Sequence, residues 1–131
     1  MSDAGWRWVT EDVVLAIDDE QIAEHGGGAS LRDMALVQSA LSRPRNLATY
    51  GDPDVAALAG SYAYGIARNH GFVDGNKRTA FVVANVFLLD HGYELTASDA
   101  EAVEVMVSLA AGEVEEVDLA GWFRRAMRPS S

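Results

Sequence analysis

The stretch His70-Gly71-Phe72-Val73-Asp74-Gly75-Asn76-Lys77-Arg78-Thr79-Ala80-Phe81 joins a polar loop to the most hydrophobic segment of the chain. The polar part contains a histidine, a carboxylate, a glycine, a side-chain amide and two adjacent cations. The segment that follows, as far as Leu89, has almost no polar face, which predicts a helix buried on nearly all sides. We expect this helix to be central, with the other elements packed around it.

The residues before this stretch predict two helices and a loop. Thr10 is a plausible N-cap, and apolar residues at helical spacing follow it as far as the glycine run 26–28. A second helix should begin near residue 31 or 33 and end before Pro44, because the residue preceding a proline is pushed out of the helical region. We expect residues 43–51 to form a loop.

A third helix should deliver the chain to His70. Asp52 and Pro53 look like its cap and its first helical position, and an apolar stripe on one face runs from Val55 to Ala67. The histidine therefore lies between the end of one helix and the start of the next.

Helices are also expected after the central segment. Gly92 should terminate the central helix, and Ser98 with Glu101 forms a capping box at the start of a fifth helix that ends at Gly112. Four residues share the apolar face of a sixth helix, namely Leu119, Trp122, Phe123 and Met127.

These elements predict an all-α fold. The 131 residues, 49% of them hydrophobic, suffice for a single domain spanning residues 1–131. We expect a compact bundle of about six helices around a buried central helix. Strand-like alternation occurs only at Tyr93–Thr96 and around Leu47–Tyr50, which leaves room for a short β-hairpin flap.

Composition and charge narrow the function. A formal charge of −10 would repel both the nucleic-acid backbone and an anionic membrane surface, so neither is expected as a direct partner. Cysteine is absent, which excludes a thiol nucleophile and a thiolate zinc site. The first ten residues lack a signal layout, and the longest apolar run falls short of the ~20 residues that cross a bilayer. We expect a cytoplasmic protein.

The central stretch has the parts of a phosphate site. If a helix starts near Asn76, the backbone N–H groups of residues 75–78 lack intrahelical partners and can bind an anion, with help from the helix dipole. Gly75 lets the backbone approach closely, and Asn76 adds a neutral donor. Lys77 and Arg78 add positive charge, and Arg78 can hold two phosphate oxygens at once.

Two further residues suggest phosphoryl transfer. His70 can accept a proton from an attacking hydroxyl near neutral pH. Asp74 is a natural ligand for Mg²⁺, which prefers one or two carboxylates together with phosphate oxygens. Simpler roles also exist: His70 as a helix-end cap, Asp74 as an N-cap, Gly75 as a turn and Phe72 as a core anchor. The other two histidines, His25 and His91, are interpreted as structural residues at helix ends.

Residues 70–81 resemble the signature of the Fic/Doc family: histidine, proline, phenylalanine, any residue, acid, glycine or alanine, asparagine, glycine or lysine, and arginine. The likeness to the family's Doc toxin branch extends over most of the chain, through segments 19–21, 24–27, 41–46 and 111–113. The family's small all-helical fold agrees with the helices expected above.

The resemblance implies a role for each residue of the site. His70 would be the base for the target hydroxyl, Asp74 the magnesium-associated acid, Asn76 an anion-hole donor and Arg78 the phosphate clamp. Phe72 would anchor the loop.

Lys77 replaces a glycine that many relatives have, and Phe81 stands where a second arginine is usual. Both differences point away from transfer of AMP. They favour ATP, bound with Mg²⁺, as the donor of its terminal phosphate to a threonine or serine of a protein. The resemblance implies that this protein is elongation factor Tu, and its phosphorylation would inhibit translation.

Other differences concern rigidity and regulation. Gly71 replaces the usual proline, so the loop should be less rigid, and Asp18 stands where many relatives have a histidine. Residues 43–52 match the family's target-docking flap by position alone. The family also implies an antitoxin whose carboxyl-terminal segment folds on the toxin, and no inhibitory helix motif occurs within this chain. The alternatives are AMP transfer to a protein hydroxyl and a non-catalytic nucleotide- or partner-binding module.

Overall fold

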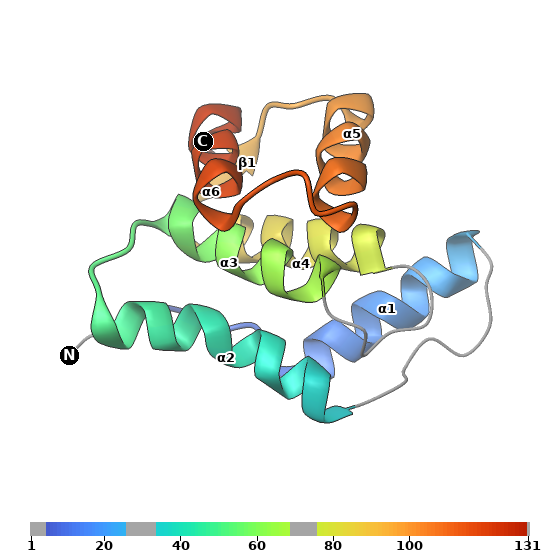
Figure 1. The fold of residues 1–131 in the computed structure, drawn as a ribbon, viewed down its shortest axis with the longest axis horizontal. Coiled ribbons are helices and arrows are strands. Elements are labelled where there is room, and N and C mark those ends of the chain that lie inside the picture. Colours follow the sequence, from blue (N-terminus) through green and yellow to red (C-terminus); the bar gives the residue numbers. More distant parts are fainter. Residues whose placement is uncertain (1–4, 26–33, 69–75, 131) are drawn as a thin grey trace.

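The computed structural model describes residues 5–25, 34–68 and 76–130, and the fold in these ranges is all-helical with one small sheet (Figure 1). The helices are α1 (Glu11–His25), α2 (Met34–Tyr50), α3 (Val55–Ala67), α4 (Asn76–Asp90), α5 (Asp99–Ala110) and α6 (Glu116–Ala126). The strands are β1 (Tyr93–Leu95) and β2 (Met127–Pro129). The expected class, a bundle of about six helices, is confirmed.

Local sequence signals explain several helix ends. Ser98 caps α5 by accepting a hydrogen bond from the backbone N–H of Glu101, whose carboxylate accepts one in return, so the predicted capping box is confirmed. Gly92 follows α4 with φ +84° and Gly112 follows α5 with φ +81°, a conformation that a side chain would strain. Helix α3 is capped by Asp54 rather than by Asp52, so it starts two residues later than expected.

Helix α2 differs most from the expectation, since it runs through Pro44 to Tyr50 where a loop or strand was predicted. Pro44 has no N–H for the carbonyl of Ala40, which a regular helix would bond. That carbonyl faces α3 at Gly65, where a Cβ would lie only 3.3 Å from the Ala40 oxygen. The buried proline ring and this close packing against α3 offset the lost hydrogen bond.

The strands join distant parts of the chain. The predicted strand at Tyr93–Thr96 is confirmed as β1, but its antiparallel partner is β2, with Glu94 opposite Arg128. Residues 47–50 are helical, so the prediction of a strand there, and of a hairpin flap built on it, was wrong. The sheet instead ties the end of α4 to the end of α6.

Helix α3 lies at the centre of the bundle, packed against α2, α4 and α6 (Figure 1). Eleven of its thirteen residues are buried, including Gly60, where a Cβ would lie 3.0 Å from the backbone nitrogen of Ala120 in α6. Small residues let neighbouring helices approach α3 on three sides. Helix α4 shares the centre, but its Leu89 is 50% exposed, so α3 is the more completely buried of the two.

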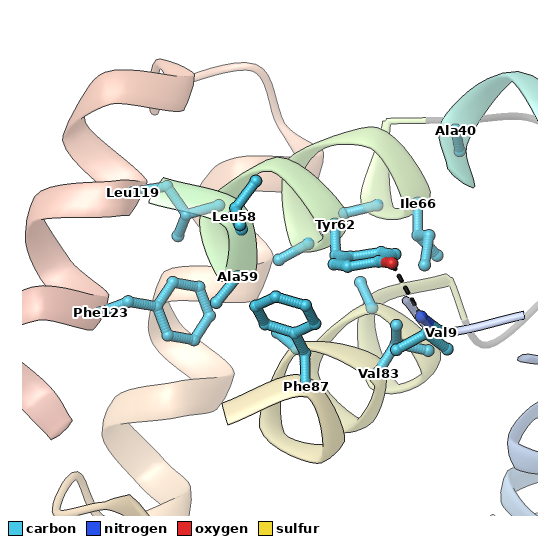
Figure 2. Close-up of a cluster of buried hydrophobic side chains, with 14 of the residues drawn as sticks. Val9, Ala40, Leu58, Ala59, Tyr62, Ile66, Val83, Phe87, Leu119 and Phe123 are labelled. Atoms are coloured by element: carbon cyan, nitrogen blue, oxygen red, sulfur yellow. Dashed lines mark hydrogen bonds between the residues drawn. The ribbon is translucent and has the colours of Figure 1, made fainter. Parts of the chain in front are cut away.

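Aromatic rings fill the core between α3 and α4 (Figure 2). Phe87 of α4 is fully buried, and its ring centroid lies 5.2 Å from that of Tyr62 in α3. The Tyr62 hydroxyl accepts a hydrogen bond from the backbone N–H of Val9 at 2.9 Å, which ties the segment before α1 to the core. Burial raises the pKa of Tyr62 to about 12, so this hydroxyl stays protonated.

Asp54 links the start of α3 to α6. Its carboxylate accepts hydrogen bonds from the backbone N–H of Ala57 at 2.8 Å and from the Arg124 side chain at 2.8 and 2.9 Å. The Arg124 hydrogen bonds are the main reason that the pKa of Asp54 is lowered. The ionised form of Asp54 therefore stabilises the folded state.

Replacing Asp54 by alanine should lower the free energy of unfolding at pH 7 by about 1 kcal/mol, because α3 loses its N-cap. A lowered pKa gives stability that is present above the ordinary carboxyl pKa and lost as the pH falls through the folded value. The difference from wild type in urea denaturation should therefore persist as the pH falls from 7 toward the ordinary carboxyl pKa of 3.8, and should shrink below that pH. Arg124→Ala keeps the Asp54 cap and should lower the free energy of unfolding by less than Asp54→Ala does. An equal loss would show that the ion pair with Arg124, rather than the cap, provides the stability.

Within the described ranges, no helix combines the length and apolar character that crossing a membrane requires.

Candidate functional site

The candidate site lies where α3 leads into α4. Helix α4 begins at Asn76, as predicted, and only the eight residues 68–75 connect it to the end of α3. The two helices pack side by side along their length (Figure 1). The first N–H groups of α4 have no intrahelical acceptors, so this end of the helix has the electrostatic character of an anion site.

The structure describes part of the predicted site. His70, Phe72, Asp74 and Gly75 lie outside the described residues, so their roles stay predictions. The backbone of Asn76 and Lys77 forms the first turn of α4, and nothing is described of these two side chains. Arg78 is the predicted site residue whose side chain is described, and it is exposed.

The first turn of α4 has an outer and an inner side. Arg78 is exposed, whereas the next two residues, Thr79 and Ala80, are fully buried. The exposed guanidinium is therefore carried on a turn that is anchored in the core. A phosphate clamp needs both properties, since it must reach a ligand while its backbone stays fixed.

The other side of the connection also carries an exposed cation. Arg68 is the C-cap of α3, where a positive charge complements the helix dipole. Its guanidinium carbon lies 5.4 Å from the centre of the Tyr64 ring, and Arg43 of α2 contacts the same ring at 5.3 Å. Exposed arginines thus precede and follow residues 69–75 in a chain whose formal charge is −10.

A buried polar pair lies beneath this turn. The hydroxyl of Thr79 donates a hydrogen bond to the carboxylate of Asp18 in α1, with 3.0 Å between the oxygens. Burial raises the pKa of Asp18 above its ordinary value, and the hydrogen bond from Thr79 offsets part of this rise. Asp18 is 1% exposed and Thr79 is fully buried.

From the sequence alone, Asp18 is notable only as a departure from relatives, and Thr79 has no predicted role. One signal was available: Asp18 lies four residues after Val14, on the face of α1 that turns toward the core. A carboxylate on a buried face needs a partner. The partner could not be identified, because it lies 61 residues away along the chain.

His91 has the structural role that was predicted for it. Its ring packs against Phe87, with 4.2 Å between the ring centres. One ring nitrogen pairs with the Phe87 carbonyl at 2.7 Å, and the other accepts a hydrogen bond from the backbone N–H of Arg7. This histidine therefore fixes the end of α4. The side chain of His25 is not among those that the structure describes, so its role stays a prediction.

Among residues 5–25, 34–68 and 76–130, no three His, Cys, Asp or Glu side chains gather as metal ligands. The predicted magnesium ligand, Asp74, lies outside these ranges and was expected to act with phosphate oxygens rather than with other side chains. The magnesium assignment therefore stays a prediction.

Comparison with known proteins places the site in a family context. The sequence profile described as "Fic/DOC family" matches residues 8–88. "Protein kinase doc" of Escherichia phage P1 is 28% identical over 120 residues, which cover 91% of this chain and 94% of that protein. "Toxin Doc" of Mycolicibacterium smegmatis is 40% identical over 75 residues, which cover 55% of this chain and 57% of that protein.

Proposed function

Because the chain belongs to the Fic/Doc family, within its Doc branch, we propose that it is a toxin that transfers the terminal phosphoryl group of ATP to a protein hydroxyl. The proposed acceptor is a threonine or serine of elongation factor Tu, and its modification would inhibit translation in the cytoplasm. The observation that carries the proposal is the sequence of residue types from His70 to Arg78, which ends in the first turn of α4 with the exposed side chain of Arg78.

Two residues of α4 support phosphoryl rather than nucleotidyl transfer. Lys77 replaces the glycine that would leave room for the inner phosphates of a nucleotide. Phe81 replaces the second arginine, and its half-buried ring packs against the core, so this position offers no clamp for those phosphates. The name of the phage P1 relative, a protein kinase, agrees with this choice.

In the proposed reaction, each motif residue has a separate task. His70 accepts the proton of the target hydroxyl while the hydroxyl oxygen forms a bond to the γ-phosphorus of ATP. The bond between the γ-phosphorus and the bridging oxygen breaks, and ADP leaves. Arg78 and the first N–H groups of α4 stabilise the charge on the transferred group. No covalent enzyme intermediate is required.

The donor set at this site suits Mg²⁺. One carboxylate, Asp74, next to a phosphate site matches the preference of this ion, whereas catalytic zinc takes three protein ligands. Asp74 would hold the ion together with ATP, and the ion would supply charge neutralisation on the phosphates. The neighbouring residues Asn76 and Arg78 keep the roles given above.

Inhibition is proposed to come from a second protein. A cognate antitoxin would bind with a carboxyl-terminal segment that is disordered alone and folds on the toxin. The name of the Mycolicibacterium smegmatis relative, Toxin Doc, supports a toxin. Direct binding to nucleic acid or membrane is not part of the proposal, because the chain carries a formal charge of −10.

Labelled ATP separates the candidate reactions. The protein is incubated with elongation factor Tu, Mg²⁺ and ATP labelled on either the γ- or the α-phosphate, and label on the factor is counted. We expect label from the γ-phosphate alone. Label from the α-phosphate would establish AMP transfer instead, and no label from either would exclude transfer to this target.

A matched pair of arginine variants tests whether the label depends on the site. Arg78→Ala should remove most of the γ-label, because the phosphate clamp is lost. Arg125→Ala removes an exposed arginine from α6 and should leave labelling unchanged. Equal labelling by the two variants would show that Arg78 does not clamp the phosphate.

A further inference from the structure

Tyr62 aside, the described part of the chain has three buried polar side chains, and the hydrogen bond between Asp18 and Thr79 accounts for two of them. The third is Ser61 in α3. Burying a carboxylate is costly, and an apolar pair would pack α1 against α4 without that cost. A hydrogen bond differs from an apolar contact because it fixes direction as well as distance.

The location of the pair connects it to the candidate site. Thr79 is the fourth residue of α4 and directly follows Arg78, and the helix begins only three residues before Thr79, at Asn76. The backbone between these residues is a single helical turn, so a rotation at Thr79 also moves Arg78 and the free N–H groups. Helices α1 and α4 pack against each other, and the hydrogen bond between Asp18 and Thr79 lies in this contact.

We propose that Asp18 is a positioning residue for the phosphate site. Through Thr79 it fixes the rotation of the first turn of α4, and this rotation places Arg78 and the unpaired N–H groups where they meet the phosphates of ATP. The inference rests on the proposed function for its ligand, but the coupling between Asp18 and this turn is a property of the fold. Neither residue is expected to touch ATP.

A merely structural pair would join α1 to α4 without affecting the ligand. The two roles differ in what substitution changes: a structural pair affects stability alone, whereas a positioning pair also changes nucleotide affinity in variants that remain folded. Conservative variants make the distinction sharp. Thr79→Val has nearly the same shape but lacks the hydroxyl, Thr79→Ser keeps it, and Asp18→Asn keeps an oxygen that can accept the hydrogen bond.

The first measurement is the affinity for ATP with Mg²⁺, by calorimetry, for folded variants. Thr79→Val and Asp18→Ala should each bind about tenfold more weakly, which corresponds to one misplaced hydrogen bond, and the double variant should be no weaker than either. Thr79→Ser and Asp18→Asn should stay near wild type. The control Val37→Ala opens a fully buried site in α2 and should lower stability without lowering affinity.

The second measurement is hydrogen exchange of the backbone amides of residues 80–83, which donate the first hydrogen bonds within α4. These amides should exchange faster in Thr79→Val than in Val37→Ala. If the wild type binds no ATP, the proposed function fails, and the exchange result alone then decides whether the pair positions this turn. Unchanged exchange at residues 80–83, or wild-type ATP affinity in Thr79→Val, would overturn the inference.

Discussion

Replacing His70 by alanine should reduce phosphoryl transfer by about 10²–10⁴-fold, which is the usual contribution of a general base. Binding of ATP should remain close to wild type. ATP binding should be unaffected because, in the proposed mechanism, the first turn of α4 binds the phosphates, whereas His70 acts only on the proton of the incoming hydroxyl. Transfer is measured with γ-labelled ATP, and binding by calorimetry with the same protein preparation.

His91 provides a control histidine. It lies at the far end of α4, where its ring nitrogens pair with the backbone of Phe87 and Arg7. His91→Ala should therefore lower stability and leave the transfer rate per folded molecule unchanged. If His70→Ala lost ATP binding and transfer to the same degree, His70 would be a structural residue and the proposed base would have to be sought elsewhere.

Phe87→Ala should lower the free energy of unfolding by about 3–5 kcal/mol, the range for truncating a buried phenylalanine. The ring is fully buried and lies among Trp6, Trp8, Tyr62 and His91, so its removal leaves a cavity that several rigid rings surround. The total free energy of unfolding of a small domain is only about 5–15 kcal/mol. Urea denaturation followed by tryptophan fluorescence measures the loss directly.

Leu89→Ala is the matched control, because Leu89 lies on the same helix but is 50% exposed. It should cost under about 1 kcal/mol, since a half-exposed side chain gives up less buried surface. Equal losses of unfolding free energy in the two variants would contradict the difference in burial between Phe87 and Leu89. The comparison also shows which face of α4 the core depends on.

The sequence predicted the features of the fold that depend on neighbours a few residues apart. The capping box of Ser98 and Glu101 and the left-handed glycines Gly92 and Gly112 are local, so their chemistry is visible in the sequence. The start of α4 at Asn76 was predicted for the same reason. The order of residues from His70 to Arg78 was sufficient to name the candidate site.

The errors occurred where distant residues decide. Pro44 predicted a helix end, but packing of α2 against Gly65 of α3 keeps the helix continuous. The apolar composition of α4 predicted that it would be the central helix, but it shares the centre with α3, whose small residues let α2, α4 and α6 approach it. Strand β1 was expected, but its pairing with β2 joins residues more than thirty positions apart.

The sequence by itself determined the helical class, several helix ends set by caps and glycines, and the candidate residues for the proposed phosphate site, because each depends on local spacing. Only the tertiary structure decided which helix is most buried, that α2 passes through Pro44, and that Thr79 pairs with Asp18. These outcomes depend on contacts between segments far apart in the chain, and local periodicity carries no information about which buried polar groups will meet.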